Sequence, residues 1–334
     1  MISIALFNSR GDVGTTTLVH HLAHMLSRRR VGVLAVDLDP QADLTALCMD
    51  EEQIEVAWGS APGLADTVRP ALRGPADAAD AARVRPVSVR PGLWLLPGSP
   101  DLGGLEGLLA DAWPASLGGD PAAVRATTAF QRTIARAANS VGADVVLLDV
   151  GRHLTAVNRA ALLGARTVLT PLTPDLFSLR GLDSLGPTLA GWRRDWQQRV
   201  LPHIPPDLDV LGIPVPREVM TPLGYVVRRP EPRLDSRAGA YGRWLDRLPG
   251  AYADRLLGQQ PPAAGDDDPY RIAVLRNYRT LLQLAHDARK PMFDLKTADG
   301  ALGSTQKYVQ TCYREFKELA DSVVRRAEQV IAAH

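Results

Sequence analysis

The segment at residues 8–18, NSRGDVGTTTL, has the residue types and spacing of a loop that binds phosphate. Gly11 and Gly14 follow an apolar run, and three threonines then lead into an expected helix. Backbone N–H groups at the start of a helix point at a ligand, and the helix dipole favours negative charge there. Phosphate loops also use a lysine ammonium just before the hydroxyl residue, and this segment has none. We therefore expect a phosphate seat without its usual cation.

Carboxylates follow two other apolar runs, at points where strands of a sheet are expected to end. Asp37 and Asp39 lie in DLDPQ, and Asp149 lies at the end of ADVVLLDV. Ligands of open parallel sheets bind at the carboxyl ends of the strands. A strand-end aspartate there can hold Mg²⁺, often through water. These carboxylates predict a magnesium site beside the phosphate loop.

The elements that must position these residues alternate between apolar runs and amphipathic segments. Residues 2–7, 18–29 and 31–41 read as strand, helix and strand, a unit that implies a parallel sheet. Residues 143–150 and 165–174 are continuous apolar runs typical of buried parallel strands, with a helical segment between them. We expect an α/β fold with a doubly wound, mostly parallel sheet flanked by helices and with C-terminal helical decoration.

We expect residues 1–334 to form a single domain, and the remaining segments lie within it. Between the second and third apolar runs, only residues 92–98 indicate a strand. Residues 201–268 are rich in proline and arginine, and predict either surface loops around one strand at 208–215 or a lid or partner-binding region. Residues 305–333 carry apolar side chains at alternating spacings of three and four, which predicts an amphipathic helix packed on the domain.

Composition narrows the class of protein. The chain has 334 residues and is 46% hydrophobic, so we expect a large core. Its formal charge of +1 indicates no general preference for polyanions. No apolar run reaches the roughly 20 residues of a membrane helix, and residues 1–30 do not resemble a secretory signal. We expect a cytoplasmic protein that does not enter a membrane. Cys48 and Cys312 lack metal-ligand spacing and are expected to be buried thiols.

Other polar groups allow two interpretations each. His20 and His24 are one helical turn apart, which suits a metal, but no carboxylate stands at a matching spacing. We therefore expect these histidines and His21 to serve helix packing or face solvent. Four arginine groups could form either a DNA surface or solvated faces: residues 28–30, 193/194, 228/229 and 325/326. The acidic run at residues 266–268 is expected to be a loop.

These motifs resemble those of the ParA/MinD group of deviant Walker A P-loop ATPases, and more closely the ParA-like proteins of plasmid and chromosome partition. The resemblance runs over most of the chain. It is densest in IALFNSRGDVGTTTLVHHLAHML, VLAVDLDPQADLT, VVLLDVGRHLTAVNRAALLGARTVLTPLTPDLFSLRGL and the stretch around RKPMFDLKTADGALGS. It implies ATP or ADP with Mg²⁺ as cofactors, a homodimer around the nucleotide, a ParB-like partner protein and non-specific DNA binding.

The family loop K-G-G-x-G-K-T-T falls on eight consecutive residues: Arg10, Gly11, Asp12, Val13, Gly14, Thr15, Thr16 and Thr17. The resemblance implies that Arg10 occupies the position that reaches the partner subunit's phosphates. Thr15 occupies the position of the lysine that holds the β- and γ-phosphates. The implied magnesium ligands are Thr16, Asp37 and Asp149. Asp39 is implied to position the attacking water, so Asp39 and Arg10 carry the implied catalytic roles.

Three loop positions depart from the family pattern. Arg10 keeps the positive charge, Thr15 removes one, and Asp12 adds a negative charge beside the phosphates. Losing a charged hydrogen bond to phosphate costs about 1.5 to 3 kcal/mol, or roughly ten- to a hundred-fold in affinity. Hydrolysis should suffer more, because the lysine also offsets charge that develops during phosphoryl transfer. All four lysines lie within residues 290–317, so an arginine, such as Arg152, or that C-terminal region would have to supply a replacement.

Three functions remain open from the sequence. The leading hypothesis is a ParA-like partition or positioning protein that binds and hydrolyses ATP weakly or not at all and acts through protein contacts. The second is a functional partition ATPase that uses Arg10, dimerises with ATP and binds DNA non-specifically. The third is a nucleotide-independent DNA-binding or scaffold protein.

Overall fold

A computed structural model describes most of the chain. The described residues are 1–11, 13–60, 62–73, 84–204, 215–229, 238–262 and 268–332. Asp12, nearly all of the strand expected at 208–215, and Asp266 and Asp267 of the acidic run lie outside this part. No helix within it is both long enough and apolar enough to cross a membrane.

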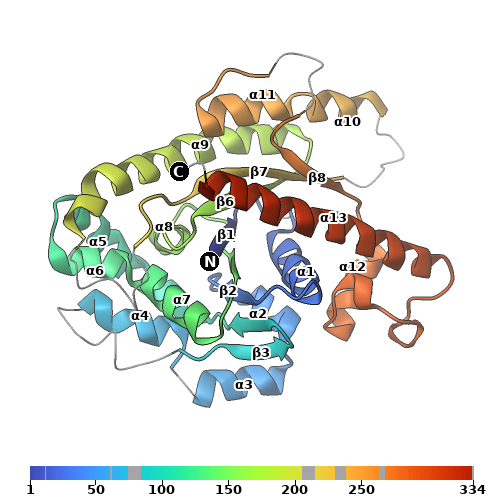
Figure 1. The fold of residues 1–334 in the computed structure, drawn as a ribbon, viewed down its shortest axis with the longest axis horizontal. Coiled ribbons are helices and arrows are strands. Elements are labelled where there is room, and N and C mark those ends of the chain that lie inside the picture. Colours follow the sequence, from blue (N-terminus) through green and yellow to red (C-terminus); the bar gives the residue numbers. More distant parts are fainter. Residues whose placement is uncertain are drawn as a thin grey trace.

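The described residues form an eight-stranded sheet with helices on both faces (Figure 1). Its strand order is β3-β4-β2-β5-β1-β6-β7-β8, and neighbouring strands are parallel except for the β3–β4 pair. The strands are β1 (Ile2–Leu6), β2 (Val33–Asp37), β3 (Val87–Arg90), β4 (Leu93–Leu96), β5 (Val145–Asp149), β6 (Thr167–Leu172), β7 (Thr221–Arg228) and β8 (Arg271–Leu275).

The helices connect these strands and cover both faces of the sheet. They are α1 (Thr15–Arg28), α2 (Asp43–Cys48), α3 (Glu51–Ser60), α4 (Leu64–Arg73), α5 (Glu106–Leu117), α6 (Pro121–Thr127), α7 (Ala129–Ser140), α8 (Ala156–Leu162), α9 (Leu176–Asp195), α10 (Ala238–Leu245), α11 (Leu248–Tyr252), α12 (Arg279–Ala288) and α13 (Ser304–Ala332). Shorter helical turns are η2 (Pro100–Leu105), η3 (Trp196–Val200), η4 (Leu201–His203), η6 (Ala253–Leu257), η7 (Met292–Asp294) and η8 (Thr297–Asp299).

Two hydrophobic clusters fill the space between the sheet and its helical layers. Apolar side chains of α1, α2, α12 and α13 pack on one face of the sheet, and α13 lies alongside α1. Side chains of α4, α5, α7, α8, α9 and α11 pack on the other face. The central strands β1, β2, β5 and β6 are therefore buried on both faces, which explains their continuous apolar sequences.

The predicted fold class is confirmed, with differences at particular elements. The first helix begins at Thr15, three residues earlier than expected, because Gly14 adopts a left-handed conformation and the threonines already form the first turn. Region 201–268 contains β7, and β3 adds an antiparallel edge strand. Neither β3 nor β7 was expected from the sequence, and β8 was not expected either. Alternation in β3 is weak, and β7 carries Pro222 and Gly224, which are uncommon within strands.

Candidate functional site

The loop between β1 and α1 presents the first backbone N–H groups of α1. Gly14 closes the loop with φ +81, a conformation that glycine adopts without the strain other residues would carry. Among the described residues, no side chain caps the start of α1, and its first turn contains no acidic residue. The uncapped helix start, which comprises Thr15, Thr16 and Thr17, is therefore the part of this edge best suited to an anion.

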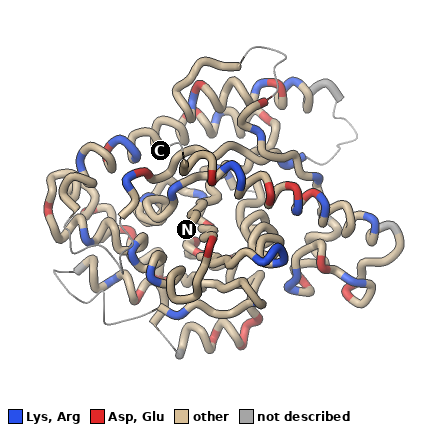
Figure 2. Tube along the Cα trace, in the orientation of Figure 1, with Lys and Arg blue, Asp and Glu red and all other residues tan. Residues whose placement is uncertain are grey.

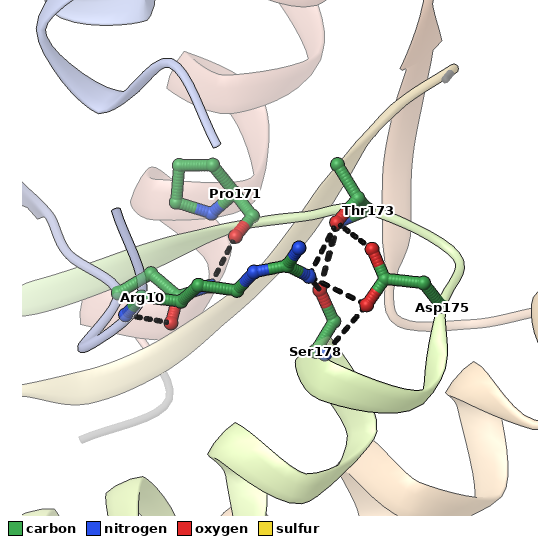
Figure 3. Close-up of polar contacts among 6 residues, drawn as sticks. Arg10, Pro171, Thr173, Asp175 and Ser178 are labelled. Carbon is green, nitrogen blue, oxygen red and sulfur yellow. Dashed lines mark hydrogen bonds and ion pairs between the residues drawn. The ribbon is translucent and has the colours of Figure 1, made fainter. Parts of the chain in front are cut away.

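Arg10 is held by residues of its own chain at the end of β6 and the start of α9 (Figure 3). Its Nη1 forms an ion pair with Asp175 Oδ1 at 2.5 Å, and donates to Thr173 Oγ1 at 3.0 Å and to Ser178 Oγ at 3.1 Å. Burial would raise the pKa of Asp175, but hydrogen bonds from Arg10, Ser178 and Thr173 outweigh it and keep that pKa below its usual value. The guanidinium also lies 5.6 Å from the ring centre of Phe177. Side chains of its own chain thus hold the Arg10 guanidinium in place.

Asp37 sits at the end of β2, and neighbouring groups donate three hydrogen bonds to its carboxylate. It accepts hydrogen bonds from the backbone N–H of Asp39 and from both the N–H and the hydroxyl of Thr45. Gly98 lies so close that an added Cβ would come within 2.7 Å of Asp37 Cγ. The Thr45 hydroxyl in turn accepts from Gly98 N at 2.9 Å. These contacts fix the Asp37 carboxylate in one orientation.

Asp149 lies beside Asp37, because the two residues are register partners on β5 and β2. Both are buried, and within the part of the chain that the structure describes Asp149 Oδ2 has no hydrogen-bond partner. Burial raises the pKa of Asp37 to about 7, and burial together with the Asp37 charge raises the pKa of Asp149, while a hydrogen bond from the Thr16 side chain opposes this. Adjacent buried carboxylates with an orphaned oxygen and a nearby hydroxyl are the oxygen donors that Mg²⁺ prefers. Thr16, Asp37 and Asp149 therefore fit a magnesium ion.

Asp39 lies on the same edge of the sheet, two residues beyond Asp37. It is half-buried, and its Oδ1 accepts a hydrogen bond from Gln41 N at 3.0 Å. An added Cβ on Gly151, the residue after Val150, would lie 3.3 Å from Asp39 Cγ, so Asp39 approaches the end of β5. The structure thus brings the carboxylates of Asp37, Asp39 and Asp149 to one edge, as the sequence analysis expected.

Two arginines approach the glycines of the loop. A Cβ on Gly11 would lie 2.7 Å from Arg152 Nη1, and a Cβ on Gly14 would lie 3.0 Å from Arg228 Nη1. The sequence analysis suggested Arg152 as a source of replacement charge, but treated Arg228 only as part of a surface group. Arg228 ends β7, and the parallel β6–β7 pairing carries it to the same edge of the sheet. Lys290, in the lysine-bearing C-terminal region, instead pairs with Asp299 at 2.6 Å.

A small cavity adjoins the loop on the face covered by α13. Gly14, Thr17, Arg228, Tyr278 and Phe316 are among its lining residues, and its volume is about 60 Å³. Pockets that hold small molecules usually measure roughly 300–1,000 Å³. A bulky ligand would therefore enter this cavity only if side chains around it moved.

The histidines of α1 are all buried, so the expectation that they might face solvent is wrong. Cys48, the last residue of α2, lies within ligand distance of His20 and His24, which the spacing along the chain did not indicate. Cys312 is buried as expected, whereas Cys48 is only half-buried as a whole residue.

Several arginines of the groups proposed for DNA are paired within the chain. Arg28 pairs with Asp294 and Arg29 with Asp321, each at 2.7 Å, and Arg326 donates to a backbone carbonyl. Figure 2 shows basic residues spread over many elements, with acidic residues among them. These pairs reduce the positive charge that the groups can offer to a polyanion.

Comparison with known proteins identifies the family. A family model described as an AAA domain matches residues 1–200, which is more than half of the chain. The chromosome-partitioning ATPase Soj of Thermus thermophilus is 32% identical over 211 residues, which cover 63% of this chain and 67% of Soj. Protein IncC of Escherichia coli is 27% identical over 197 residues, covering 58% of this chain and 47% of IncC. The chain spans between 42% and 67% of the length of the curated relatives it matches.

Solved structures show the same fold at low sequence identity. The ATP complex of a Cyanothece McdA variant superposes with a TM-score of 0.62 at 15% identity, covering 98% of this chain and 96% of that chain. The cell division ATPase MinD of Pyrococcus furiosus gives a TM-score of 0.53 at 17% identity, covering 97% and 98%. With the domain match and the strand-end carboxylates, this chain belongs to the ParA/MinD-type family of P-loop ATPases.

Proposed function

We propose that this chain is a ParA-like partition or positioning protein that binds Mg²⁺-nucleotide weakly, hydrolyses it poorly and acts mainly through protein contacts. The observation that carries the proposal is that the phosphate loop has no free cation among its described residues. Thr15 offers no charge at the position of the family lysine, and Arg10, the nearest replacement in sequence, is paired with Asp175. A triphosphate would have to compete for Arg10 with a carboxylate and two hydroxyls.

The retained carboxylates support some remaining affinity for Mg²⁺-nucleotide. Asp37 and Asp149 keep the buried, paired geometry that suits a divalent ion, and Thr16 stands beside them. Bound Mg²⁺ would neutralise charge on the phosphates. The backbone N–H groups of α1 would contribute hydrogen bonds that do not depend on the missing lysine.

Poor hydrolysis follows from what the chemical step requires. Charge on the transferred phosphoryl group is stabilised by fixed cations, and an added or removed cation changes the rate far more than the ground-state affinity. Asp39 would orient the attacking water in this proposal, but orientation alone does not offset charge developing at the leaving phosphate. We therefore propose that the site binds nucleotide but contributes little to its hydrolysis.

Protein contacts are supported by apolar side chains exposed beside Arg10. Leu176 and Phe177, at the start of α9, are 46% and 70% exposed. They adjoin the loop arginine, and Phe177 lies under its guanidinium. Large exposed apolar groups next to a binding site indicate a contact surface, and we propose a second copy of this chain, or a ParB-like partner, as its occupant.

A second candidate function is a working partition ATPase that uses other arginines. Arg152 and Arg228 approach Gly11 and Gly14 closely enough to reach a phosphate seated on the loop. If they replaced the lysine, ATP would drive dimerisation, and the dimer would bind DNA non-specifically.

Sedimentation of the full chain with and without ATP·Mg²⁺ and DNA separates the two candidates. We expect the monomer–dimer distribution to respond little to nucleotide, and Phe177→Ser to weaken self-association more than Tyr308→Ser, an exposed aromatic on α13. ATP-dependent dimers that bind DNA and release phosphate would favour the working ATPase instead. An unchanged distribution in Phe177→Ser would exclude the proposed self-contact.

A further inference from the structure

His20, His24 and Cys48 form a cluster outside the nucleotide site. His20 and His24 lie one turn apart on α1, and Cys48 ends α2. The imidazole nitrogens and the thiol sulfur that face one another all lie within 4.8 Å. The residues thus come from the two helices that follow the phosphate loop and the DLDPQ segment.

One separation in the cluster equals that between two ligands of a tetrahedral metal site. Zinc binds cysteine sulfur at about 2.3 Å and histidine nitrogen at about 2.0–2.1 Å, so the two atoms of a tetrahedral pair are about 3.5 Å apart. Cys48 Sγ lies 3.5 Å from His20 Nδ1. The ring centroids of His20 and His24 are 4.5 Å apart, and the ligand atoms of all three residues lie within 4.8 Å of one another, so small side-chain shifts would bring them around one ion.

No contact within the described residues accounts for the buried ring nitrogens of His24. Only 6% of the residue is exposed, and neither of its ring nitrogens has a hydrogen-bond partner among the described residues. The neighbouring His21 is different: its Nδ1 pairs with the carbonyl of Thr17 at 2.7 Å, and its Nε2 accepts from Met292 N at 2.9 Å. His21 therefore joins α1 to η7. His24 differs, because both of its nitrogens are buried with no described partner. Unsatisfied buried polar groups are rare in native proteins, and an ion is one kind of partner that would satisfy these.

The electrostatic surroundings keep these histidines in the form that binds metals. Burial lowers the pKa of His24 to about 3 and that of His20 well below its usual value. Both imidazoles are therefore neutral near pH 7, and each has a lone pair available to a cation.

We propose that His20, His24 and Cys48 bind a thiophilic divalent cation of the zinc type. On binding, the Cys48 S–H bond breaks, its proton leaves to solvent, and sulfur and two nitrogens bond to the ion, with a fourth position for water or another ligand. The site shares no ligand with the proposed magnesium site, although burial and the charges of Asp37 and Asp149 raise the pKa of the Cys48 thiol to about 12, and the metal must offset this. It would join α1 to α2, and so hold the two segments that carry the phosphate loop and Asp37 in a fixed relation.

Cobalt titration tests the proposal directly. The full chain, freed of any histidine tag and of metal by chelator, is titrated with Co²⁺ and then with Zn²⁺. We expect one Co²⁺ per chain, visible absorption bands of tetrahedral cobalt and a thiolate-to-cobalt band, all displaced by Zn²⁺. Absence of the thiolate band in the folded wild-type protein would overturn the proposal, because cobalt on surface histidines or carboxylates produces none.

Variants identify the ligands. Cys48→Ala and His24→Leu should each lower cobalt affinity at least tenfold, a loss expected even for residues that only support a ligand. Cys312→Ala is the matched control, since Cys312 is the other free cysteine, and should bind like the wild type. Unchanged binding in Cys48→Ala, or loss in Cys312→Ala alone, would refute the assignment.

A measurement on the wild-type chain alone covers the case in which ligand variants do not fold. Alkylation followed by mass spectrometry reports each cysteine separately. Zn²⁺ should slow modification of Cys48 at least tenfold and leave the rate at Cys312 unchanged. Equal rates at Cys48 with and without Zn²⁺ would contradict the site.

Discussion

Restoring the loop lysine, Thr15→Lys, should raise the affinity for ATP·Mg²⁺. Thr15 is the first residue of α1, directly after the left-handed Gly14, and is half-buried. A lysine there can direct its flexible side chain along the loop without displacing a core residue. The substitution adds the one charged donor that the described loop lacks.

The expected gain follows from the strength of a charge-assisted hydrogen bond. Such a bond contributes about 1.5 to 3 kcal/mol, which corresponds to roughly ten- to a hundred-fold in the dissociation constant. The guanidinium of Arg228 already lies close to Gly14 and would repel a new ammonium. The lower part of that range is therefore expected, and adding Asp12→Gly should increase the gain by removing a negative charge from the loop.

Isothermal titration calorimetry with ATP·Mg²⁺ measures this effect. Gln310→Lys, at an exposed position of α13, adds the same charge away from the loop and is the matched control. It should leave the affinity within about twofold of wild type, as expected for a distant, screened surface charge. A folded Thr15→Lys variant with no gain over this control would refute the inference that the loop is a phosphate seat missing only its cation.

Three further predictions follow from contacts at the site. Asp175→Asn keeps a side-chain oxygen for the start of α9 but removes the charge opposite the loop arginine. It should increase ATP affinity a few-fold in calorimetry. The free energy of unfolding should change by about 0.5 kcal/mol or less, because the Arg10–Asp175 pair is one-third exposed. Unchanged affinity would show that the ion pair does not compete with phosphate. Burial raises the pKa of Asp149, so the folded chain keeps a proton that the unfolded chain releases near pH 4. In chelator, the wild-type free energy of unfolding should therefore fall as the pH rises above about 4, by up to about 1.4 kcal/mol per pH unit. Urea denaturation should show a flatter dependence for Asp149→Asn, and parallel curves would contradict the buried acid pair. Gly98→Ala places a Cβ 2.7 Å from Asp37 Cγ and should cost about 1–3 kcal/mol in thermal or urea unfolding. Gly107→Ala, where an added Cβ meets open space within α5, should cost nothing, and equal effects of the two would argue against the close approach.

The place of the proposed nucleotide site in the fold could be predicted from the sequence because the signals of its residues are local. The glycines and threonines of the loop adjoin one apolar run, and the acidic residues end two others. Parallel strands bring those ends to one edge, and the register of β2 against β5 then places Asp37 opposite Asp149. The pairing of β2 with β5 is the one feature of this arrangement that the local signals do not give.

The partners of the loop arginine could not be predicted, because they depend on distant segments. Arg10 meets Asp175 across 165 residues of chain, and no pattern near either residue indicates the pair. Arg228 reaches the loop only through the pairing of β7 with β6. The sequence therefore suggested that Arg10 was available to a phosphate, whereas the structure pairs it with a carboxylate.

The histidine cluster shows a similar limit. His20 and His24 have metal-ligand spacing along one helix, but their third neighbour is Cys48, which the turn after β2 returns to α1. Spacing rules apply to ligands on one or two adjacent elements. The position of α2 against α1 had to be known before the cysteine could be associated with the histidines.

The most direct test of the central claim is calorimetric titration of the wild-type chain with ATP·Mg²⁺, paired with phosphate release under the same conditions. With Thermus Soj as the reference, we predict binding at least about tenfold weaker and turnover reduced by a larger factor, since the missing lysine acts more strongly in the chemical step. Micromolar binding with turnover equal to that of Soj would contradict the account, and would show that Arg10, Arg152 or Arg228 serves in place of the lysine.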